Sequence, residues 1–196
     1  METLPIIDLT QGIDASVAEK IGEACHEIGF LLLAGHGISQ KTIGDLRQSV
    51  IKFFDQPQTT KMSYCVTQDN YRGYIPLGFF TPNASGDEAD CYEGFKLHGE
   101  FETTDDICRQ CDLYGPNEWP QKPVDLQTHV KAYWDACDHV ARILLGALSH
   151  CMGLPPNTLQ RNFDNPLTNM TLLHYPPSQE QVGIHPHKDT DALTIL

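Results

Sequence analysis

Two side chains near the C-terminus have the types and the spacing of a metal-binding pair. His187 and Asp189 form a His-x-Asp pair, and the apolar run Ala192–Leu196 follows them. In a strand, residues two apart point to the same face, with a rise of roughly 6.5–7 Å between them. This spacing allows an imidazole and a carboxylate to lean onto one metal ion. The pair therefore predicts two ligands of a metal centre.

The ligand types indicate which metal this centre would hold. Two histidines and one carboxylate on one face of an ion, with the other positions open, form the usual non-haem Fe(II) oxygenase site. The second histidine would follow Asp189, and because the sequence ends at Leu196 we expect this third ligand to be absent from it. His185 also precedes the pair, but three ligands along one straight strand would span roughly 13 Å and could not converge on one ion. We therefore interpret His185 as a neighbour of the site or a surface residue.

The composition is that of an ordinary globular chain. The sequence has 196 residues, of which 40% are hydrophobic and 20% charged, enough for one substantial domain with a core. The net charge of −13 makes nucleic acid and anionic membranes poor partners, so we expect neither. A local acidic cluster consists of Asp87, Glu88, Asp90 and Glu93. We interpret this cluster as a solvated face.

The cysteines and the N-terminus indicate the compartment. The first residues lack the basic start and long apolar run of a signal peptide, and no segment approaches the roughly 20 apolar residues of a membrane helix. The seven cysteines are an odd number without framework spacing. We therefore expect reduced thiols and a cytoplasmic protein. Cys108 and Cys111 form a lone C-x-x-C without a second pair, which does not favour a zinc or redox site.

Helical spacing and capping residues predict three helices. Apolar residues recur at helical spacing over 15–28, and Gly29 is the predicted C-cap. Ser39 is the predicted N-cap of a second helix. The third helix is predicted over 124–151, with a long apolar stripe.

Strands are predicted on both sides of these helices. The predicted strands are 4–9, 30–34 as a buried strand, 167–175 and 192–196, with short strands and long loops over 63–123. Helices and loops come first and strands with metal ligands follow, which predicts an α+β chain with a β-rich catalytic core on the C-terminal side. Two strands after residue 167 cannot close a barrel or bury a sandwich, so we expect this core to be incomplete.

Several short segments in one order resemble a known family. They are Pro5–Leu9, Gly29–Ile38, Tyr71–Tyr74, Glu93–Phe95, Gly115–Pro120, Leu173–Pro177 and His187–Leu196. On these segments the chain resembles the isopenicillin N synthase-like branch of the Fe(II)- and 2-oxoglutarate-dependent dioxygenases. The resemblance spans nearly the whole chain, and it is the order of the segments that makes it specific.

The resemblance implies a fold and a division of the chain. It implies a helical and loop-rich N-terminal region followed by the start of a double-stranded β-helix, or jelly-roll, core. The corresponding segments are 1–122 for the N-terminal dioxygenase region, 123–166 for the long helix and connector, and 167–196 for the beginning of the Fe(II)/2-oxoglutarate domain. The last segment is expected to be truncated.

The resemblance also implies an activity. It implies an oxidoreductase that oxidises a small organic molecule with O2 and 2-oxoglutarate, releasing succinate and CO2. His187 and Asp189 match two of the three iron ligands, and Tyr175 matches a position that can hydrogen-bond 2-oxoglutarate. The family's distal histidine and its Arg-x-Ser segment find no counterpart in the sequence. Within the match, Thr171 stands where a basic residue is common and Lys188 stands where Thr is usual.

Two other functions remain open. The missing third ligand favours a catalytically inactive, truncated dioxygenase-like protein or binding module. The pattern His185-x-His187-x-Asp189 is also similar to the metal motif of metallo-β-lactamase-like hydrolases. In that motif a further histidine follows the aspartate, whereas Thr190 occupies the position here. We therefore assign no catalytic residue beyond the metal ligands.

The remaining histidines are interpreted as structural residues, and one arginine is considered separately. His36 and His174 are interpreted as structural residues rather than ligands. His98, His129, His139 and His150 are interpreted as loop or helix residues without a catalytic partner. Arg72 is retained only as a possible substrate contact.

Overall fold

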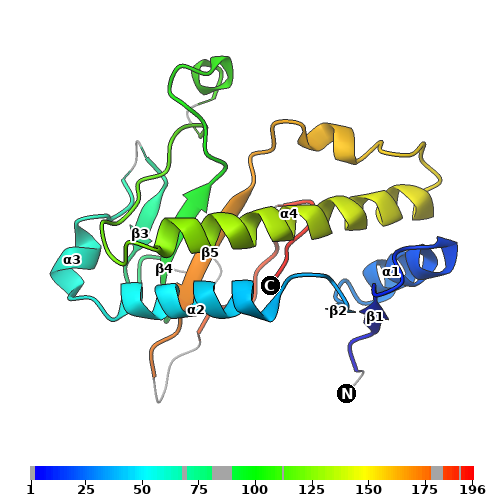
Figure 1. The fold of residues 1–196 in the computed structure, drawn as a ribbon, viewed down its shortest axis with the longest axis horizontal. Helices are drawn as coiled ribbons and strands as arrows, with labels where there is room; N and C mark the ends of the chain where they lie inside the picture. The colour runs from blue at the N-terminus through cyan, green and yellow to red at the C-terminus, as the bar shows by residue number, and fades with distance from the viewer. Residues whose placement is uncertain (1–2, 68–69, 81–89, 112, 178–182, 190) are drawn as a thin grey trace. The chain divides into compact units, whose positions relative to one another are not determined.

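Most of the chain has a described conformation. A computed structural model describes residues 3–67, 70–80, 90–111, 113–177, 183–189 and 191–196 (Figure 1). In it, helices alternate with short strands, which agrees with the predicted α+β class. The helices in the described part of the chain are too short or too polar to cross a lipid bilayer.

The chain divides into two compact units, each assembled from segments far apart in sequence. The first unit consists of Met1–Gly44, Lys131–Pro166 and Leu193–Leu196, and the second of Asp45–Val130 and Leu167–Ala192. Helices α2 (Gln40–Phe54) and α4 (Leu126–Cys151) each contribute residues to both units. The expected division at residues 122 and 166 is a matter of family architecture and stays a prediction.

The first unit begins with a small parallel sheet. Strands β1 (Ile6–Asp8) and β2 (Leu32–Ala34) pair in parallel, with Ile6 opposite Leu32. Helix α1 (Ala15–Glu27) connects them, as a crossover between parallel strands requires. The predicted buried strand over 30–34 is wrong in two respects. It is shorter than predicted, and the side chains of Phe30 and Leu32 are 65% and 50% exposed because the sheet packs on one face only.

Helix α1 has a cap at each end, of which only Gly29 was predicted from the sequence. Asp14 precedes it and accepts a hydrogen bond from the backbone N–H of Val17 at 2.8 Å, which satisfies one free donor of the first turn. At the other end, Gly29 adopts φ of 80° and its N–H donates to Ala24 O at 2.9 Å. This left-handed conformation suits glycine, so the helix ends where predicted.

The core of the first unit lies between α1, the small sheet and the second half of α4. Its fully buried members are Ile7, Leu9, Ala18, Ile21, Val140, Leu144 and Ala147. Gly22 allows α1 to approach α4, because a Cβ at this position would lie 2.7 Å from Cys151 Sγ. The apolar stripe predicted for the third helix is therefore the surface that this core uses.

The predicted strand over 192–196 is wrong. Residues 193–196 form no regular structure, although Leu193 and Ile195 pack against the core of the first unit. The alternation of apolar residues in this segment predicted a strand. The same alternation also occurs in an irregular segment in which every second side chain packs against the core. A strand needs a hydrogen-bonded neighbour, and the ladders of the described strands do not include residues 193–196.

The second unit contains a three-stranded antiparallel sheet. Its order is β3 (Gly73–Ile75), β4 (Glu93–His98) and β5 (Asn169–His174), so β4 is central. The strand predicted over 167–175 is confirmed as β5. Short 3-10 helices, η1 (Asp106–Arg109) and η2 (Gln160–Phe163), lie in the connections of the second and the first unit respectively.

Alternation along β4 gives the sheet an apolar face. Phe95 and Leu97 are fully buried, and the ring of Phe53 from α2 packs edge-on against Phe95 with centroids 4.9 Å apart. Ser39 caps α2 as predicted, since its Oγ accepts from the N–H of Thr42 at 3.0 Å. The short helix α3 (Gln58–Met62) follows and brings Lys61 to the sheet. One face of the sheet is thus covered by α2, and the side chains of Lys96 and His98 alternate onto the other.

Candidate metal centre

The segment that carries the predicted ligands lies in the second unit, beyond the end of β5. It is fastened to the residues that lead into β4. The N–H of Cys91 donates to Gly183 O at 2.9 Å, and the N–H of His185 donates to Asp90 Oδ1 at 3.0 Å. These bonds place residues 183–189 alongside the start of the central strand.

The predicted pair lies close together. His187 Nε2 and Asp189 Oδ1 are 3.3 Å apart, and the two side chains are 54% and 53% exposed. The two atoms therefore lie close to each other, and solvent reaches both side chains. The distance between them is short enough for one cation to contact both.

The ring of His187 is held by a backbone bond. Its Nδ1 lies 2.9 Å from His185 O. A carbonyl oxygen only accepts, so Nδ1 carries the proton and donates it. In the neutral ring the lone pair is then on Nε2, and it faces the carboxylate oxygen of Asp189. Two electron-rich atoms face each other in this form, an arrangement that a bound cation stabilises.

His185 has a different partner. Its Nδ1 lies 2.6 Å from Asp90 Oδ1, and the two side chains are 26% and 13% exposed. The Asp90 carboxylate therefore binds both the imidazole ring and the backbone N–H of His185. In the described segments no group of three or more His, Cys, Asp and Glu residues lies close enough to hold a metal ion.

Tyr175 follows β5 directly and is 46% exposed. Its ring packs against that of Tyr92 with centroids 5.9 Å apart, and the backbone of Gly183 approaches it so closely that a Cβ there would lie 2.9 Å from the ring. The tyrosine is thus held by its ring next to the ligand-bearing segment. Its predicted contact with 2-oxoglutarate stays a prediction.

The acidic cluster is not a solvated face in its described part. Glu93 is only 7% exposed and Asp90 binds His185, while Asp87 and Glu88 lie outside the described residues. Glu93 shares a strand face with Phe95, and this alternation was the signal that could have placed it inside. The interpretation of an exposed cluster is therefore wrong for Asp90 and Glu93.

Glu93 is the centre of a buried polar network. Its Oε2 accepts from Lys61 Nζ at 2.7 Å and from the hydroxyl of Tyr74, and its Oε1 lies 2.8 Å from His174 Nδ1. Burial alone would raise the pKa of Glu93, but the bonds from Lys61, Tyr74 and His174 outweigh it and lower the pKa. The network links α3, β3, β4 and the end of β5, so it orients the strand that leads to Tyr175.

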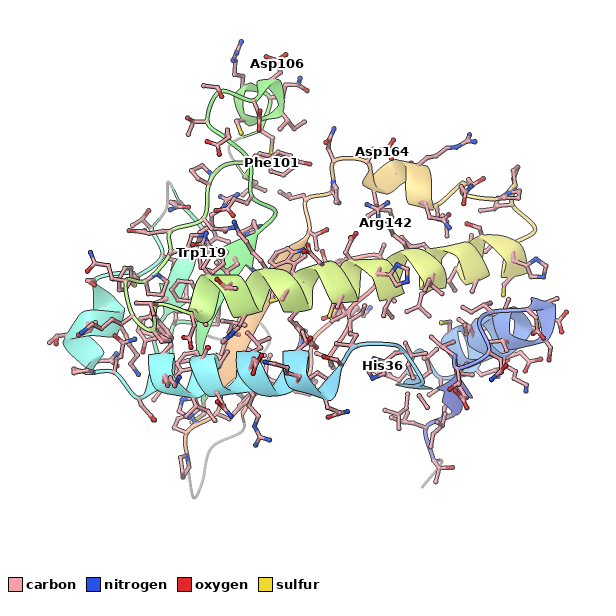
Figure 2. All side chains as sticks on the ribbon, in the orientation of Figure 1. His36, Phe101, Asp106, Trp119, Arg142 and Asp164 are labelled. Carbon is pink, nitrogen blue, oxygen red and sulfur yellow. The ribbon has the colours of Figure 1, made fainter. Side chains whose placement is uncertain are left out.

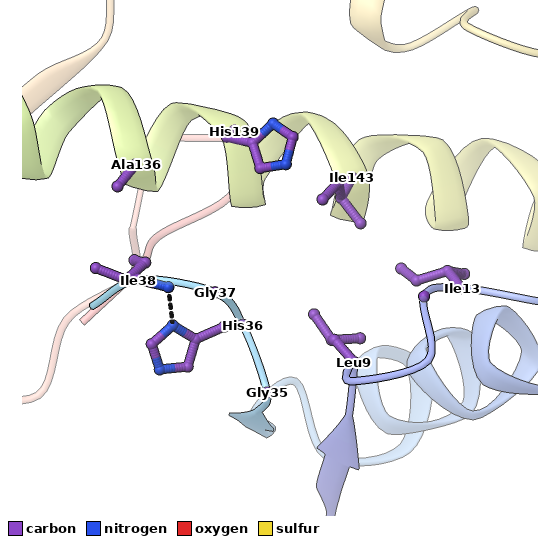
Figure 3. Close-up of a pocket in the computed structure, with 10 residues that line it drawn as sticks. Leu9, Ile13, Gly35, His36, Gly37, Ile38, Ala136, His139 and Ile143 are labelled. Carbon is purple, nitrogen blue, oxygen red and sulfur yellow. Dashed lines mark hydrogen bonds between the residues drawn. The ribbon is translucent and has the colours of Figure 1, made fainter. Parts of the chain in front are cut away.

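Most of the other histidines are placed as predicted. His36 lies in the connection between β2 and α2 (Figure 2), and its Nδ1 accepts from the N–H of Ile38 at 3.2 Å, a local structural bond (Figure 3). His174 is bound by Glu93, and His129 lies on α4 with Nδ1 2.7 Å from Ser49 Oγ. His98 is an exception, because it ends strand β4 instead of lying in a loop or helix. Its alternation with Phe95 and Leu97 places it opposite their face.

A cavity of about 450 Å³ lies in the first unit (Figure 3). Leu9, Ile13, Ile38 and Ile143 supply much of its apolar lining, and His36 and His139 also border it. None of the predicted ligands borders this cavity. It is therefore not the predicted metal centre.

The sequence is similar to those of known hydroxylases and 2-oxoglutarate-dependent dioxygenases. A homoarginine-6-hydroxylase of Arabidopsis thaliana is 29% identical over 98% of this chain and 58% of its own length. The 2-oxoglutarate-dependent dioxygenase 11 of Oryza sativa subsp. japonica is 27% identical over 98% of this chain and 53% of its own length. The chain thus spans little more than half the length of these two relatives.

A solved structure shares the fold. A protein from Caulobacter crescentus, described as belonging to the 2OG-Fe(II) oxygenase family, superposes with a TM-score of 0.80 at 21% identity. The match covers 92% of this chain and 58% of that protein. The family model described as non-haem dioxygenase in morphine synthesis N-terminal matches residues 4–122, which is more than half of the 196 residues. The chain belongs to this non-haem dioxygenase N-terminal family.

Proposed function

We propose that the protein is a non-haem Fe(II)- and 2-oxoglutarate-dependent oxygenase that oxidises a small organic molecule with O2. His187 and Asp189 are the proposed iron ligands, and Tyr175 is the proposed contact of 2-oxoglutarate. The observation that carries the proposal is the 3.3 Å distance between His187 Nε2 and Asp189 Oδ1, in a ring whose Nδ1 is held by His185 O. The family and the names of the relatives support an oxygenase over a metal-dependent hydrolase.

The residues fit the group they are proposed to hold. An imidazole nitrogen and a carboxylate oxygen are both ligands that Fe(II) accepts, and the exposure of both side chains leaves room for further ligands. The chemistry that Fe(II) supplies when bound is the coupling of O2 and 2-oxoglutarate to oxidation of a C–H bond, with succinate and CO2 as products. A third protein ligand belongs to this proposal, and no described residue is assigned to it.

The other residues position this pair. His185 O fixes the tautomer and direction of the His187 ring, and Asp90 fixes His185 in turn. We further propose that β5 is the first strand of a jelly-roll core and that residues 167–196 begin the catalytic domain. In this proposal the Glu93 network sets the position of β5 and, through it, of Tyr175.

Metal binding tests the assignment directly. Mn(II) is titrated anaerobically into the protein and its His187→Ala and Asp189→Ala variants, with the free ion followed by electron paramagnetic resonance. Each of these variants removes a proposed ligand. We expect affinity to fall by more than the roughly 10- to 100-fold that loss of an outer partner causes.

His185→Ala is the matched control, because it removes a histidine two residues away that the structure gives to Asp90. We expect it to weaken Mn(II) binding less than either ligand variant and by no more than about 100-fold, because the backbone carbonyl of His185 that holds the His187 ring remains. Unchanged binding in Asp189→Ala would refute the ligand assignment. Failure of the unsubstituted protein to bind Mn(II) would refute the proposed metal centre.

A further inference from the structure

A second group of polar side chains lies on the sheet face opposite α2. Lys96 and His98 alternate with Phe95 and Leu97 along β4 and so point to this other face. Tyr71 lies beside both, since its carbonyl oxygen is 3.2 Å from His98 Nε2 and its ring lies 5.2 Å below Lys96 Nζ. All these residues belong to the second unit.

Arg72 is a buried cation in this group. It is 4% exposed, and its Nη2 donates to Leu113 O. Among the described residues its Nε has no hydrogen-bond partner, and no carboxylate lies within ion-pair distance of its guanidinium. A buried charge of this kind is costly unless an anion compensates it.

His98 offers the complementary atom. It is 6% exposed, and its Nε2 must donate to the carbonyl of Tyr71, because a carbonyl only accepts. Burial first, and then the charges of Arg72 and Lys96, lower its pKa to about 4, so the ring is neutral at neutral pH. Nδ1 then carries a lone pair, and within the described part of the chain this atom has no partner.

Lys96 is the second cation. Its Nζ makes one long hydrogen bond, to Asn169 Oδ1 at 3.5 Å, and lies over the ring of Tyr71. No carboxylate of the described residues lies within ion-pair distance of it. Thr171 faces Lys96 across the β4–β5 ladder and adds no charge. Burial lowers the pKa of Lys96, and the charge of Asp191 raises it from beyond ion-pair distance. In a chain of net charge −13, Arg72 and Lys96 thus lack a paired carboxylate among the described residues, and both charges act on the neutral ring of His98.

We propose that Arg72, Lys96 and His98 bind a small organic carboxylate that also bears a hydroxyl or amino group. The carboxylate accepts from the guanidinium and the ammonium, and guanidinium geometry suits a planar carboxylate. The hydroxyl or amino group donates to His98 Nδ1. This one ligand satisfies both buried atoms and compensates both charges.

The site is linked to the candidate metal centre within the second unit. Asn169 Oδ1 accepts from Lys96, and Asn169 Nδ2 donates to Asp191 Oδ2 at 3.3 Å, two residues beyond Asp189. The carboxylate can therefore be the substrate that this centre oxidises, because 2-oxoglutarate has no hydroxyl or amino group to donate to His98 Nδ1. In this respect the inference rests on the proposed function, but binding itself needs neither metal nor turnover.

Calorimetry in the presence of EDTA tests the site. The probes are malate, which carries a carboxylate and a hydroxyl, 2-oxoglutarate, which lacks the donor, and dimethyl malate, which lacks the charge. We expect malate to bind and dimethyl malate not to bind. Lys96→Met should raise the dissociation constant for malate at least about tenfold, whereas Lys96→Arg should stay within about threefold.

The control is Lys20→Met, which removes the same charge from an exposed position on α1 and should leave binding unchanged. We expect malate to bind more tightly than 2-oxoglutarate, because only malate can donate to His98 Nδ1, and equal affinity for the two acids would refute that hydrogen bond. Unaltered malate binding in Lys96→Met, or no binding of either acid, would overturn the proposal. Because the metal is absent, these results are independent of the Mn(II) titration.

A measurement on the unsubstituted protein covers the case in which Lys96→Met does not fold. The imidazole ¹⁵N resonances of His98 report whether Nδ1 accepts a hydrogen bond. Added malate should shift the Nδ1 resonance and leave that of His36 in place. Binding of malate without a shift at His98 would place the ligand elsewhere and refute the site.

Discussion

At the residue scale, the charged side chains on the two faces of the three-stranded sheet differ in how completely they are hydrogen-bonded. Glu93 on the α2 side is buried and accepts bonds from Lys61, Tyr74 and His174. A buried carboxylate with three partners fixes the strands that it joins. This network therefore belongs to the scaffold of the candidate centre, and the opposite face carries the groups assigned to ligand binding.

Glu93→Gln should destabilise the protein strongly. The substitution keeps the shape of the side chain but leaves the ammonium of Lys61, which is 6% exposed, without its carboxylate. Removing one partner of a buried ion pair costs about 3–5 kcal/mol. Urea unfolding measures the loss, with Glu23→Gln on the exposed side of α1 as the matched control. A loss no larger than that of the control would show that the network does not stabilise the fold.

At the element scale, the sequence predicted helices better than strands. The caps Gly29 and Ser39 are local signals, and the structure places each at the predicted end, whereas the cap Asp14 was not predicted. The strand over 192–196 was wrong because its alternation is satisfied by packing without a ladder. Strand formation depends on a partner far away in sequence, which a local pattern does not reveal.

The cap of α1 provides a quantitative test at this scale. Asp14→Ala removes the acceptor that binds the N–H of Val17 at 2.8 Å. We expect a loss of about 1 kcal/mol in the free energy of unfolding. Asp14→Ser restores an acceptor at the same place and should recover most of the loss. Equal stability of the two variants would exclude a capping role.

At the scale of the whole molecule, the candidate site is predictable only where it is local. The pair His187 and Asp189 follows from a two-residue spacing, and the structure brings both donor atoms within 3.3 Å. The contact of Asp90 with His185 and the register that sets Lys96 opposite Thr171 join distant segments. No periodicity encodes such contacts, so of the second polar group on the sheet only Arg72 was singled out from the sequence, and its association with Lys96 and His98 was not predicted.

Two charge effects are expected to change the stability of the protein in opposite directions as the pH falls. With a net charge of −13, protonation reduces repulsion between acidic groups and favours the compact state. His98 acts in the other direction. Its pKa is about 4 in the folded protein, against about 6.5 when unfolded, so the unfolded chain binds more protons between these values. The contribution of neutral His98 is therefore complete above about pH 6.5 and is lost as the pH falls toward 4.

This sign leads to a prediction for His98→Gln, which cannot titrate. Between pH 7 and pH 5 the unsubstituted protein should lose about 1–2 kcal/mol more of its unfolding free energy than the variant, after allowance for solvent screening. Urea unfolding at the two pH values measures the difference. Burial raises the pKa of Glu93, but the bonds from Lys61, Tyr74 and His174 lower it on balance, which moves the titration of Glu93 away from this pH range. His26→Gln, at a highly exposed position on α1, is the control and should follow the unsubstituted protein. Identical pH dependence in the protein and His98→Gln would mean that His98 is not held neutral by burial, and the lone pair assigned to Nδ1 in the carboxylate site would lose its basis.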